Sequence, residues 1–302
     1  MQSNLSSALV LEDDADWDIR LMEQLRDFGL GVQALTQPLS PLPDDSFHIL
    51  PFRERDEKGY EEVAFNSLPQ TVPPMHSPYG DNWDMFWLGH CGMSFPKVKG
   101  TIPTERVIRT MDPTVPEKQF LTNMIGGDHL HDDYPDHTRA IHYVSTGLCS
   151  LAYAITQTGA QSLLQSVGVQ QMTTLDFGLR EWCDGTNGRS AHRCLTTQPA
   201  LFQPHRKAGS QTADSDIDTA AHGTGIREKA MTDVVRWSTT LNSDTLMTGG
   251  KDFVDQYPDT KGAARRSMRR RRGLNCNNQK PYLRLVDGDC REDVSNFGPS
   301  LK

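Results

Sequence analysis

The hydrophobic positions near the start of the chain form one short run that ends in acidic residues. Residues 7–11 read Ser-Ala-Leu-Val-Leu and are followed by Glu-Asp-Asp-Ala-Asp at 12–16. A short, unbroken apolar run is typical of a buried strand in a parallel sheet. Apolar residues then recur at helical spacing (Ile19, Met22, Leu25 and Phe28), with Asp16 or Asp18 as the expected N-cap. The pattern predicts a strand, an acidic turn and a helix.

Later apolar runs predict the rest of an α/β domain. Strands are expected at Trp83–Gly89, within Ala140–Ile155 and at Leu195–Phe202. Thr156 is the expected cap of a helix over Gly159–Val167. Thr173 or Thr174 opens another helix, which carries apolar residues on one face (Phe177, Leu179 and Trp182).

Two long regions lack this periodicity. Pro38–Pro74 is broken by prolines and reads as a long loop insertion, with one short strand expected at His48–Leu50. Beyond about Asn242 the composition shifts to Gly, Asp and Asn, with a run of four arginines at Arg269–Arg272. We therefore expect a folded domain over residues 1–242 and a mostly disordered, partly basic tail over 243–302.

Composition and charge exclude some classes of protein. The chain has 302 residues and a net charge of −8, which argues against non-specific nucleic-acid binding. It contains no run of about 18 apolar residues, so no transmembrane helix is predicted, and its polar first residues do not resemble a signal peptide. The six cysteines are widely spaced without a CxxC pair, so a zinc knuckle is disfavoured and any disulfide pairing stays open.

The acidic cluster is the candidate site for chemistry. Five carboxylates occur in the seven residues from Glu12 to Asp18. Ligands of open α/β sheets bind outside the carboxyl ends of strands, and Mg²⁺ or Mn²⁺ is held there by one or two carboxylates and by phosphate oxygens of the substrate. A metal–phosphate site and an acidic, solvated helix start both fit this pattern.

Other families with acids at a strand end fit less well. A response-regulator receiver needs an aspartate at the end of a later strand, but the next strand ends in Leu88-Gly89-His90. A haloacid-dehalogenase-type phosphatase needs Asp-x-Asp-x-Thr/Val, and Asp18 stands at that last position. The segment Gly127–Tyr134 resembles a two-metal hydrolase motif, but Tyr134 replaces its last histidine, which favours a polar loop.

Residues 4–18 resemble the acidic motif of fungal members of glycosyltransferase family 25, which includes bacterial lipopolysaccharide glycosyltransferases and collagen galactosyltransferases. The likeness spans residues 4–242, and further blocks match in the family's order. These blocks are Ser77–Asp84, Trp87–Gly92, Tyr153–Thr156 with Gly159–Ala160, Cys194–Phe202, Ser215–Ile217, Gly225–Lys229 and Arg236–Ser238.

The resemblance implies a GT-A-type, Rossmann-like glycosyltransferase domain that uses Mn²⁺ or Mg²⁺. The donor would be a UDP-sugar, usually UDP-galactose, and the acceptor a hydroxyl of a glycan or protein. Transfer would invert the anomeric carbon, in the Golgi or secretory lumen. The sugar nucleotide would be bound around Glu12, Asp13, Asp14 and Asp16, and the metal by Asp14 and His205. Asp176 would be the base that deprotonates the acceptor, with Glu181 in reserve.

The chain also departs from the family. In the family a nucleotide-binding half precedes the acidic strand, whereas Met1 lies only eleven residues before Glu12. We therefore expect a partial domain that lacks its first strands and exposes an apolar sheet edge, and that is inactive or unstable by itself. An upstream-extended version should then be more soluble and more active. The alternatives are a non-catalytic remnant that acts as a binding module, and another metal–phosphate enzyme.

Overall fold

The protein consists of two compact units. The computed structural model describes residues 5–40, 54–55, 61–97, 102–121, 128–169, 174–211, 225–260, 283–286 and 289–292. The first unit is Met1–Pro258 and the second is Asp259–Lys302. Within the second unit, β14 (Leu283–Val286) and β15 (Asp289–Glu292) form an antiparallel hairpin. The strand expected at His48–Leu50 and the arginine run at Arg269–Arg272 lie outside the described residues.

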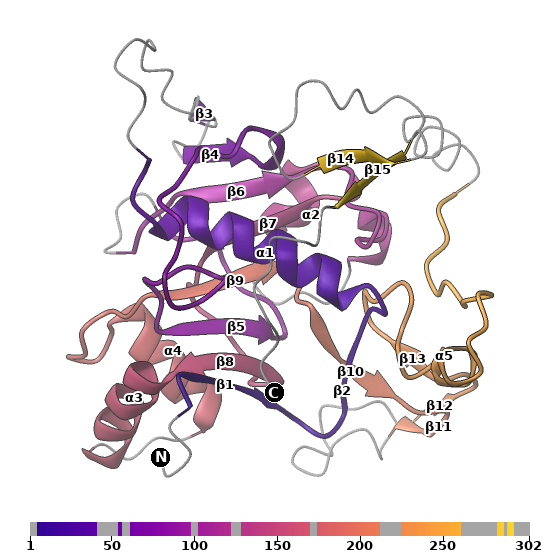
Figure 1. Ribbon diagram of the computed structural model, residues 1–302. Helices are drawn as coiled ribbons and strands as arrows, with labels where there is room; N and C mark the ends of the chain where they lie inside the picture. The colour runs from indigo at the N-terminus through magenta and orange to yellow at the C-terminus, as the bar shows by residue number, and fades with distance from the viewer. Residues whose placement is uncertain are drawn as a thin grey trace. The chain divides into compact units, whose positions relative to one another are not determined.

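A mixed β-sheet forms the centre of the first unit (Figure 1). In sheet order its main strands are β1 (Ser7–Leu11), β8 (Ala152–Thr156), β5 (Met85–Gly89), β9 (Cys194–Gln198), β7 (Arg139–Tyr143), β6 (Arg106–Arg109), β4 (Glu61–Ala64) and β3 (Glu54–Arg55). The pairs β5–β9 and β4–β6 are parallel, and the other neighbours in this order are antiparallel. With helices between the strands, the predicted α/β class is confirmed.

The strand β5 divides the core into two layers. All five of its residues are buried, and successive side chains of a strand point to opposite faces. Phe86 and Leu88 pack with Phe28 and Val32 of α1 (Leu21–Thr36), which crosses one face of the sheet in Figure 1. On the other face, Met85 and Trp87 pack with α3 (Gln157–Val169) and α4 (Leu175–Asp184). The fully apolar run that predicted this strand is therefore explained by burial on both faces.

A smaller ribbon continues from the acidic turn. It consists of β2 (Ala15–Trp17), β10 (Phe202–Arg206) and β13 (Met231–Thr232), with β10 antiparallel to both others. The bridge between Phe202 and Gly89 joins this ribbon to β5. The remaining short elements are α2 (Asp128–Asp133), α5 (Ser243–Met247), β11 (Gly209–Ser210), β12 (Ile226–Arg227) and the 3-10 turns Phe65–Ser67 and Lys118–Phe120.

The predicted environment of the first strand is wrong. The strand β1 exists at Ser7–Leu11, but all five of its residues are exposed. Its described neighbour, β8, is antiparallel, and β1 lies at one end of the sheet order (Figure 1). An apolar run predicts that a strand forms, but it does not predict which other elements cover the faces of that strand. The expected exposed sheet edge is present in the described part of the chain.

Other boundaries differ for local reasons. The helix α1 starts after Arg20 rather than after Asp16 or Asp18. The carboxylate of Asp16 accepts the backbone N–H of Trp17, and that of Asp18 accepts the backbone N–H of Arg20 and pairs with its guanidinium. The strand expected at Leu195–Phe202 divides into the end of β9 and the start of β10. The expected loop Pro38–Pro74 contains β4, and the first unit continues past Asn242 through α5 to Pro258. Helices α3 and α4 confirm their predictions; Gly159 N donates to the Thr156 hydroxyl, and Thr174 is the N-cap of α4.

Two disulfides join segments that the sequence left unpaired. Cys91 bonds to Cys149, and Cys183 at the end of α4 bonds to Cys194 at the start of β9.

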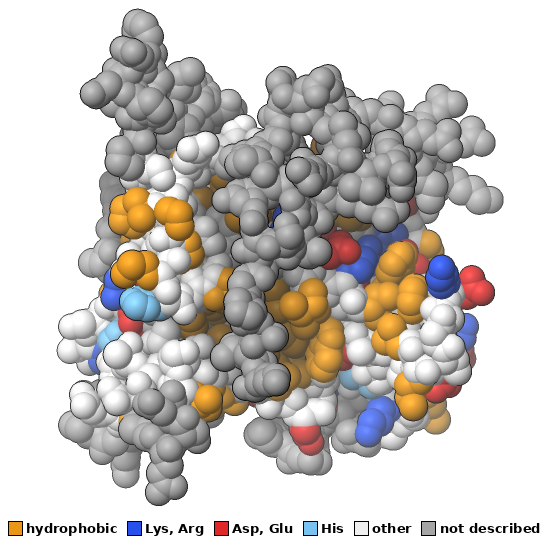
Figure 2. Space-filling model, viewed as in Figure 1, with side chains coloured by type: hydrophobic (Ala, Val, Ile, Leu, Met, Phe, Trp, Pro, Cys, Tyr) orange, Lys and Arg blue, Asp and Glu red, His pale blue; other side chains and the backbone are white. Residues whose placement is uncertain are grey.

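On the face that carries α1, hydrophobic side chains reach the surface in several patches (Figure 2). Among the described residues, no helix combines the length and the apolar character that crossing a bilayer requires.

Candidate active site at the acidic turn

The acidic turn lies at the edge of the sheet where several strands end. The strands β1 and β5 are both antiparallel to β8, so they run in the same direction, and β9 is parallel to β5. Glu12 follows β1 at that edge. Its backbone N–H donates to the carbonyl of Leu151 at 2.9 Å, and the hydroxyl of Ser150 donates to its carboxylate at 2.9 Å. Glu12 and Asp13 are both exposed.

Asp14 has a partly exposed side chain, 37% of which is accessible to solvent, but one of its carboxylate oxygens is buried. Its Oδ1 atom is buried and has no hydrogen-bond partner in the described structure. Its Oδ2 atom lies 3.9 Å from Nη1 of Arg206. Burial raises the pKa of the Asp14 carboxyl, and this effect outweighs the lowering by the guanidinium of Arg206. A cation near Oδ1 would offset the cost of burying this charge.

His205 lies directly beside Asp14. The two strands pair here, and the backbone N–H of His205 donates to the carbonyl of Asp14 at 2.8 Å. The imidazole Nδ1 lies 3.0 Å from the hydroxyl of Thr232 and 3.7 Å from Oδ2 of Asp16. The structure therefore places Asp14 and His205, which are both predicted as metal ligands, next to each other on paired backbone segments, with the His205 Nδ1 facing Thr232 and Asp16.

Asp16 lies in the core rather than on the open side of the turn. Its side chain is 1% exposed. It accepts hydrogen bonds from the hydroxyl of Thr232 at 2.6 Å, from the hydroxyl of Ser238, and from the backbone N–H of Thr240 at 3.1 Å. These bonds attach the segment 232–240 to β2. The carboxylate of Asp16 therefore has a structural role in holding the turn, whatever else it contacts.

Asp176 is one loop away from the turn. Its carboxylate accepts hydrogen bonds from the backbone N–H of Cys149 at 3.2 Å and of Phe177 at 2.9 Å. The next residue of that loop, Ser150, is the one that bonds Glu12. Burial raises the pKa of Asp176, but hydrogen bonds from Thr174 and the backbone outweigh burial and lower it overall. A lowered pKa keeps the carboxylate ionised at neutral pH.

Glu181 is further along α4 and is engaged in an ion pair. Its carboxylate lies 2.6 Å from Nη1 of Arg189 and also accepts a hydrogen bond from Asn187. A carboxylate paired with a guanidinium is a weaker candidate for a base, because accepting a proton would break the ion pair. The carboxylate of Asp176 is also hydrogen-bonded, but its partners are a hydroxyl and backbone N–H groups, and it lies beside the loop of Ser150, which bonds Glu12.

The other polar residues noted in the sequence have structural partners. His90 is buried, its Nε2 lies 3.1 Å from the carbonyl of Thr197, and burial lowers its pKa to about 4. Asp84 accepts a hydrogen bond from the backbone N–H of Arg193 at the start of β5. In the former two-metal candidate, His131 is bonded to Asp132, and the Tyr134 hydroxyl donates to Glu62.

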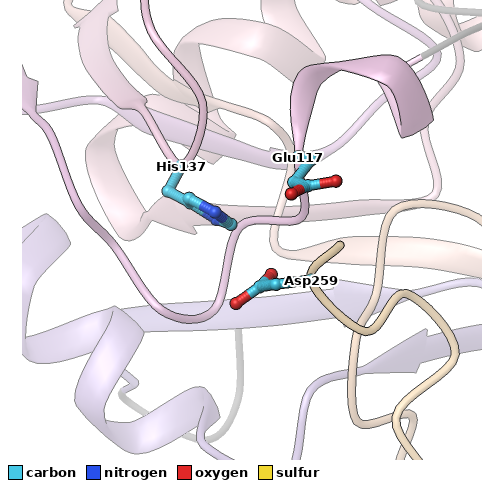
Figure 3. Close-up of side chains that lie close together, drawn as sticks. All are labelled: Glu117, His137 and Asp259. Carbon is cyan, nitrogen blue, oxygen red and sulfur yellow. The ribbon is translucent and has the colours of Figure 1, made fainter. Parts of the chain in front are cut away.

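A second pair of possible metal ligands was not predicted from the sequence. The ligand atoms of Glu117 and His137 lie within 4.8 Å of each other in the first unit (Figure 3). Figure 3 also draws Asp259, which is the first residue of the second unit and is therefore not placed relative to this pair. The imidazole Nδ1 of His137 lies 2.7 Å from the carbonyl of Val115. This pair has only two ligands in one unit, so we assign no metal site to it.

The sequence also missed Arg206 and Thr232. Arg206 could have been found as the basic residue next to His205, but no local pattern distinguishes Thr232 from other threonines.

Comparisons with protein-family models, curated proteins and solved structures found no match for this chain. The acidic turn itself combines a buried carboxylate oxygen, an imidazole and a guanidinium within one small region.

Proposed function

We propose that this chain is a metal-dependent glycosyltransferase of the GT-A type, related to glycosyltransferase family 25. It transfers a sugar, with galactose as the first candidate, from a UDP-sugar to a hydroxyl of a glycan or protein, with inversion. The observation that carries the proposal is the buried, unpartnered Oδ1 of Asp14, next to His205 at the edge where β5 and β9 end. The resemblance of residues 4–242 to the family supports the choice of reaction.

The residues of the turn fit a hard divalent cation. Asp14 and His205 would hold Mn²⁺ or Mg²⁺, and oxygens of the diphosphate and water would complete its coordination, as is usual for these ions. When bound, the metal supplies positive charge that neutralises the diphosphate leaving group. Arg206, 3.9 Å from Asp14, adds a second positive charge on the same side.

Asp176 accepts the proton of the acceptor hydroxyl in this proposal. Its hydrogen bonds to backbone N–H groups fix its orientation and keep it ionised. An ionised carboxylate of fixed orientation can accept a proton from a hydroxyl that binds within hydrogen-bonding distance of it. Glu181 is less suitable as the base because its carboxylate forms an ion pair with the guanidinium of Arg189.

The test is Mn²⁺-dependent release of UDP from UDP-sugars, measured together with Mn²⁺ binding by calorimetry in the presence of UDP. Asp14→Ala should lower UDP release by about 100-fold or more, which is the usual scale for a charge-stabilising group, and should weaken Mn²⁺ binding. Asp252→Ala makes the same substitution at an exposed acid outside residues 12–16 and is the matched control. Release of UDP that needs no metal, or that is equal in the Asp14 and Asp252 variants, would contradict the proposal.

One observation favours a second candidate, a family fold that binds without catalysis. Within the described residues, β1 pairs with β8 on one side only, and its apolar side chains are exposed. Binding of Mn²⁺–UDP without any turnover would support this candidate. Hydrolysis of other phosphate esters in preference to UDP-sugars would instead indicate a different metal–phosphate enzyme.

A further inference from the structure

A serine and a histidine form a hydrogen-bonded pair away from the acidic turn. Ser162 lies on α3 and His192 lies just before β9, and the serine Oγ is 2.8 Å from the imidazole Nε2. His192 precedes the start of β9, whereas the acidic turn is at the edge where β5 and β9 end. The pair is therefore at the opposite edge of the sheet and is independent of the proposed glycosyltransferase site. Both side chains are partly exposed.

The hydrogen bonds around the pair determine where each proton lies. The imidazole Nδ1 of His192 is 2.9 Å from the backbone carbonyl of Trp182, and a carbonyl can only accept. Nδ1 therefore carries the proton, and Nε2 of the neutral ring presents its lone pair to Ser162. The indole N–H of Trp182 donates to the serine Oγ at 3.3 Å. Because an indole can only donate, the serine hydroxyl proton is directed to Nε2.

The base is held in place from several sides. The ring of His192 stacks on that of Trp182, with centroids 3.9 Å apart. The backbone N–H of His192 donates to the carbonyl of Cys183, and the disulfide from Cys183 to Cys194 closes the loop that carries the histidine. A hydroxyl next to a base that is itself oriented by a third group is the arrangement of an activated nucleophile.

We propose that Ser162 is a nucleophile activated by His192, and that the pair transfers acyl groups from activated esters. The serine Oγ attacks the ester carbonyl carbon while its proton moves to Nε2 of His192. The C–O bond to the alcohol then breaks, and the alcohol leaves with that proton. Water, deprotonated by His192, hydrolyses the acyl-serine to release the acid and restore the pair. Trp182 is a positioning residue: it contacts Ser162 and His192 and lies buried in the core.

The structural alternative is that His192 only caps the carbonyl of Trp182 near the C-terminus of α4. The two roles differ in reactivity. A capping histidine leaves Ser162 an ordinary hydroxyl, which does not react with electrophilic probes. A nucleophile forms a covalent adduct with a fluorophosphonate, in which the serine oxygen displaces fluoride.

The experiment is labelling of the full chain with a fluorophosphonate probe, followed by peptide mass spectrometry. We expect one adduct on Ser162, none in Ser162→Ala, and a labelling rate lowered about 100-fold in His192→Gln, the scale of a lost general base. Ser166→Ala is the matched control, since Ser166 is on the same helix and its hydroxyl is bonded to Arg189. It should be labelled at the wild-type rate.

Each outcome decides between the two roles. Absence of an adduct on the wild-type chain, or an adduct on a residue other than Ser162, overturns the proposal even if Ser162→Ala does not fold. Equal labelling of His192→Gln and wild type also overturns it. Asp14→Ala should be labelled normally, so failure of the glycosyltransferase proposal leaves this one intact, and the reverse also holds.

Discussion

The hydroxyl of Thr232 donates to the carboxylate of Asp16 at 2.6 Å and joins positions 216 residues apart. The same carboxylate also accepts hydrogen bonds from the hydroxyl of Ser238 and the backbone N–H of Thr240. The imidazole of His205 contacts the hydroxyl of Thr232. The segment 232–240, near the end of the first unit, is thus hydrogen-bonded to the buried carboxylate of the acidic turn. The arrangement of Asp14 and His205 depends on this support, although the supporting residues do not belong to the candidate metal ligands.

The first prediction concerns the stability that Asp16 provides. Asp16→Ala should lower the free energy of unfolding by about 2–4 kcal/mol, because it leaves buried donors of Thr232 and Ser238 without an acceptor. Urea unfolding followed by circular dichroism measures this. Asp13→Ala, which removes an exposed acid of the same turn, should change the value by less than about 0.5 kcal/mol. Similar unfolding midpoints for the two variants would show that the Asp16 contacts do not stabilise the fold.

The second prediction concerns the pH dependence of stability. Burial lowers the pKa of His90 to about 4 and that of His142 to about 3, from 6.5 in each case. Below pH 6.5 the unfolded chain takes up protons that the folded chain does not, so stability should be full above pH 6.5 and should fall as pH decreases towards 4. The slope is about 1.4 kcal/mol per pH unit for each histidine.

Glutamine variants measure the contribution of each histidine. His142→Gln should remove about half of the slope that the two buried histidines contribute between pH 6.5 and pH 4 in urea titrations. A slope that is identical in wild type and in His142→Gln would mean that His142 becomes protonated in the folded state without cost.

The third prediction concerns the exposed edge at β1. Val10 is 40% exposed on a strand whose described neighbour is on one side only. A lysine on an edge strand opposes pairing with another chain. Val10→Lys should therefore slow aggregation several-fold, measured by light scattering at increasing concentration. Met247→Lys, on the exposed helix α5, adds the same charge elsewhere. If both variants aggregate equally slowly, net charge rather than the edge is responsible.

Much of the fold could be predicted because the relevant signals are local. The run at β5 is apolar at each position because both faces are covered, and the helix α4 begins directly after Thr174, one of the two threonines expected to open it. The position of the acidic turn at the end of β1 also followed from adjacent residues. Such patterns depend on the chain within a few residues, so a single sequence carries them.

The failures depend on distant parts of the chain. The run at β1 reads like that of a buried strand, but burial depends on neighbours that the run does not specify. Asp16 and Asp18 looked like helix caps, yet Asp16 bonds Thr232 and Asp18 binds Arg20 and the backbone of Trp237. The proximity of Asp14 and His205 came from the family resemblance, and the orientation of Ser162 towards His192 had no signal in the sequence.

Because of its two disulfides, the covalent structure of the chain depends on the redox conditions in which it folds. Cys149 precedes the serine that bonds Glu12, and Cys183 and Cys194 close the loop of His192. In the cytosol, thiol reductants keep such cysteines reduced, whereas the disulfides form in an oxidising lumen. Protein recovered from a reducing host would lack both cross-links, one beside each proposed site, and a loss of function in such a preparation would reflect its production rather than its active residues.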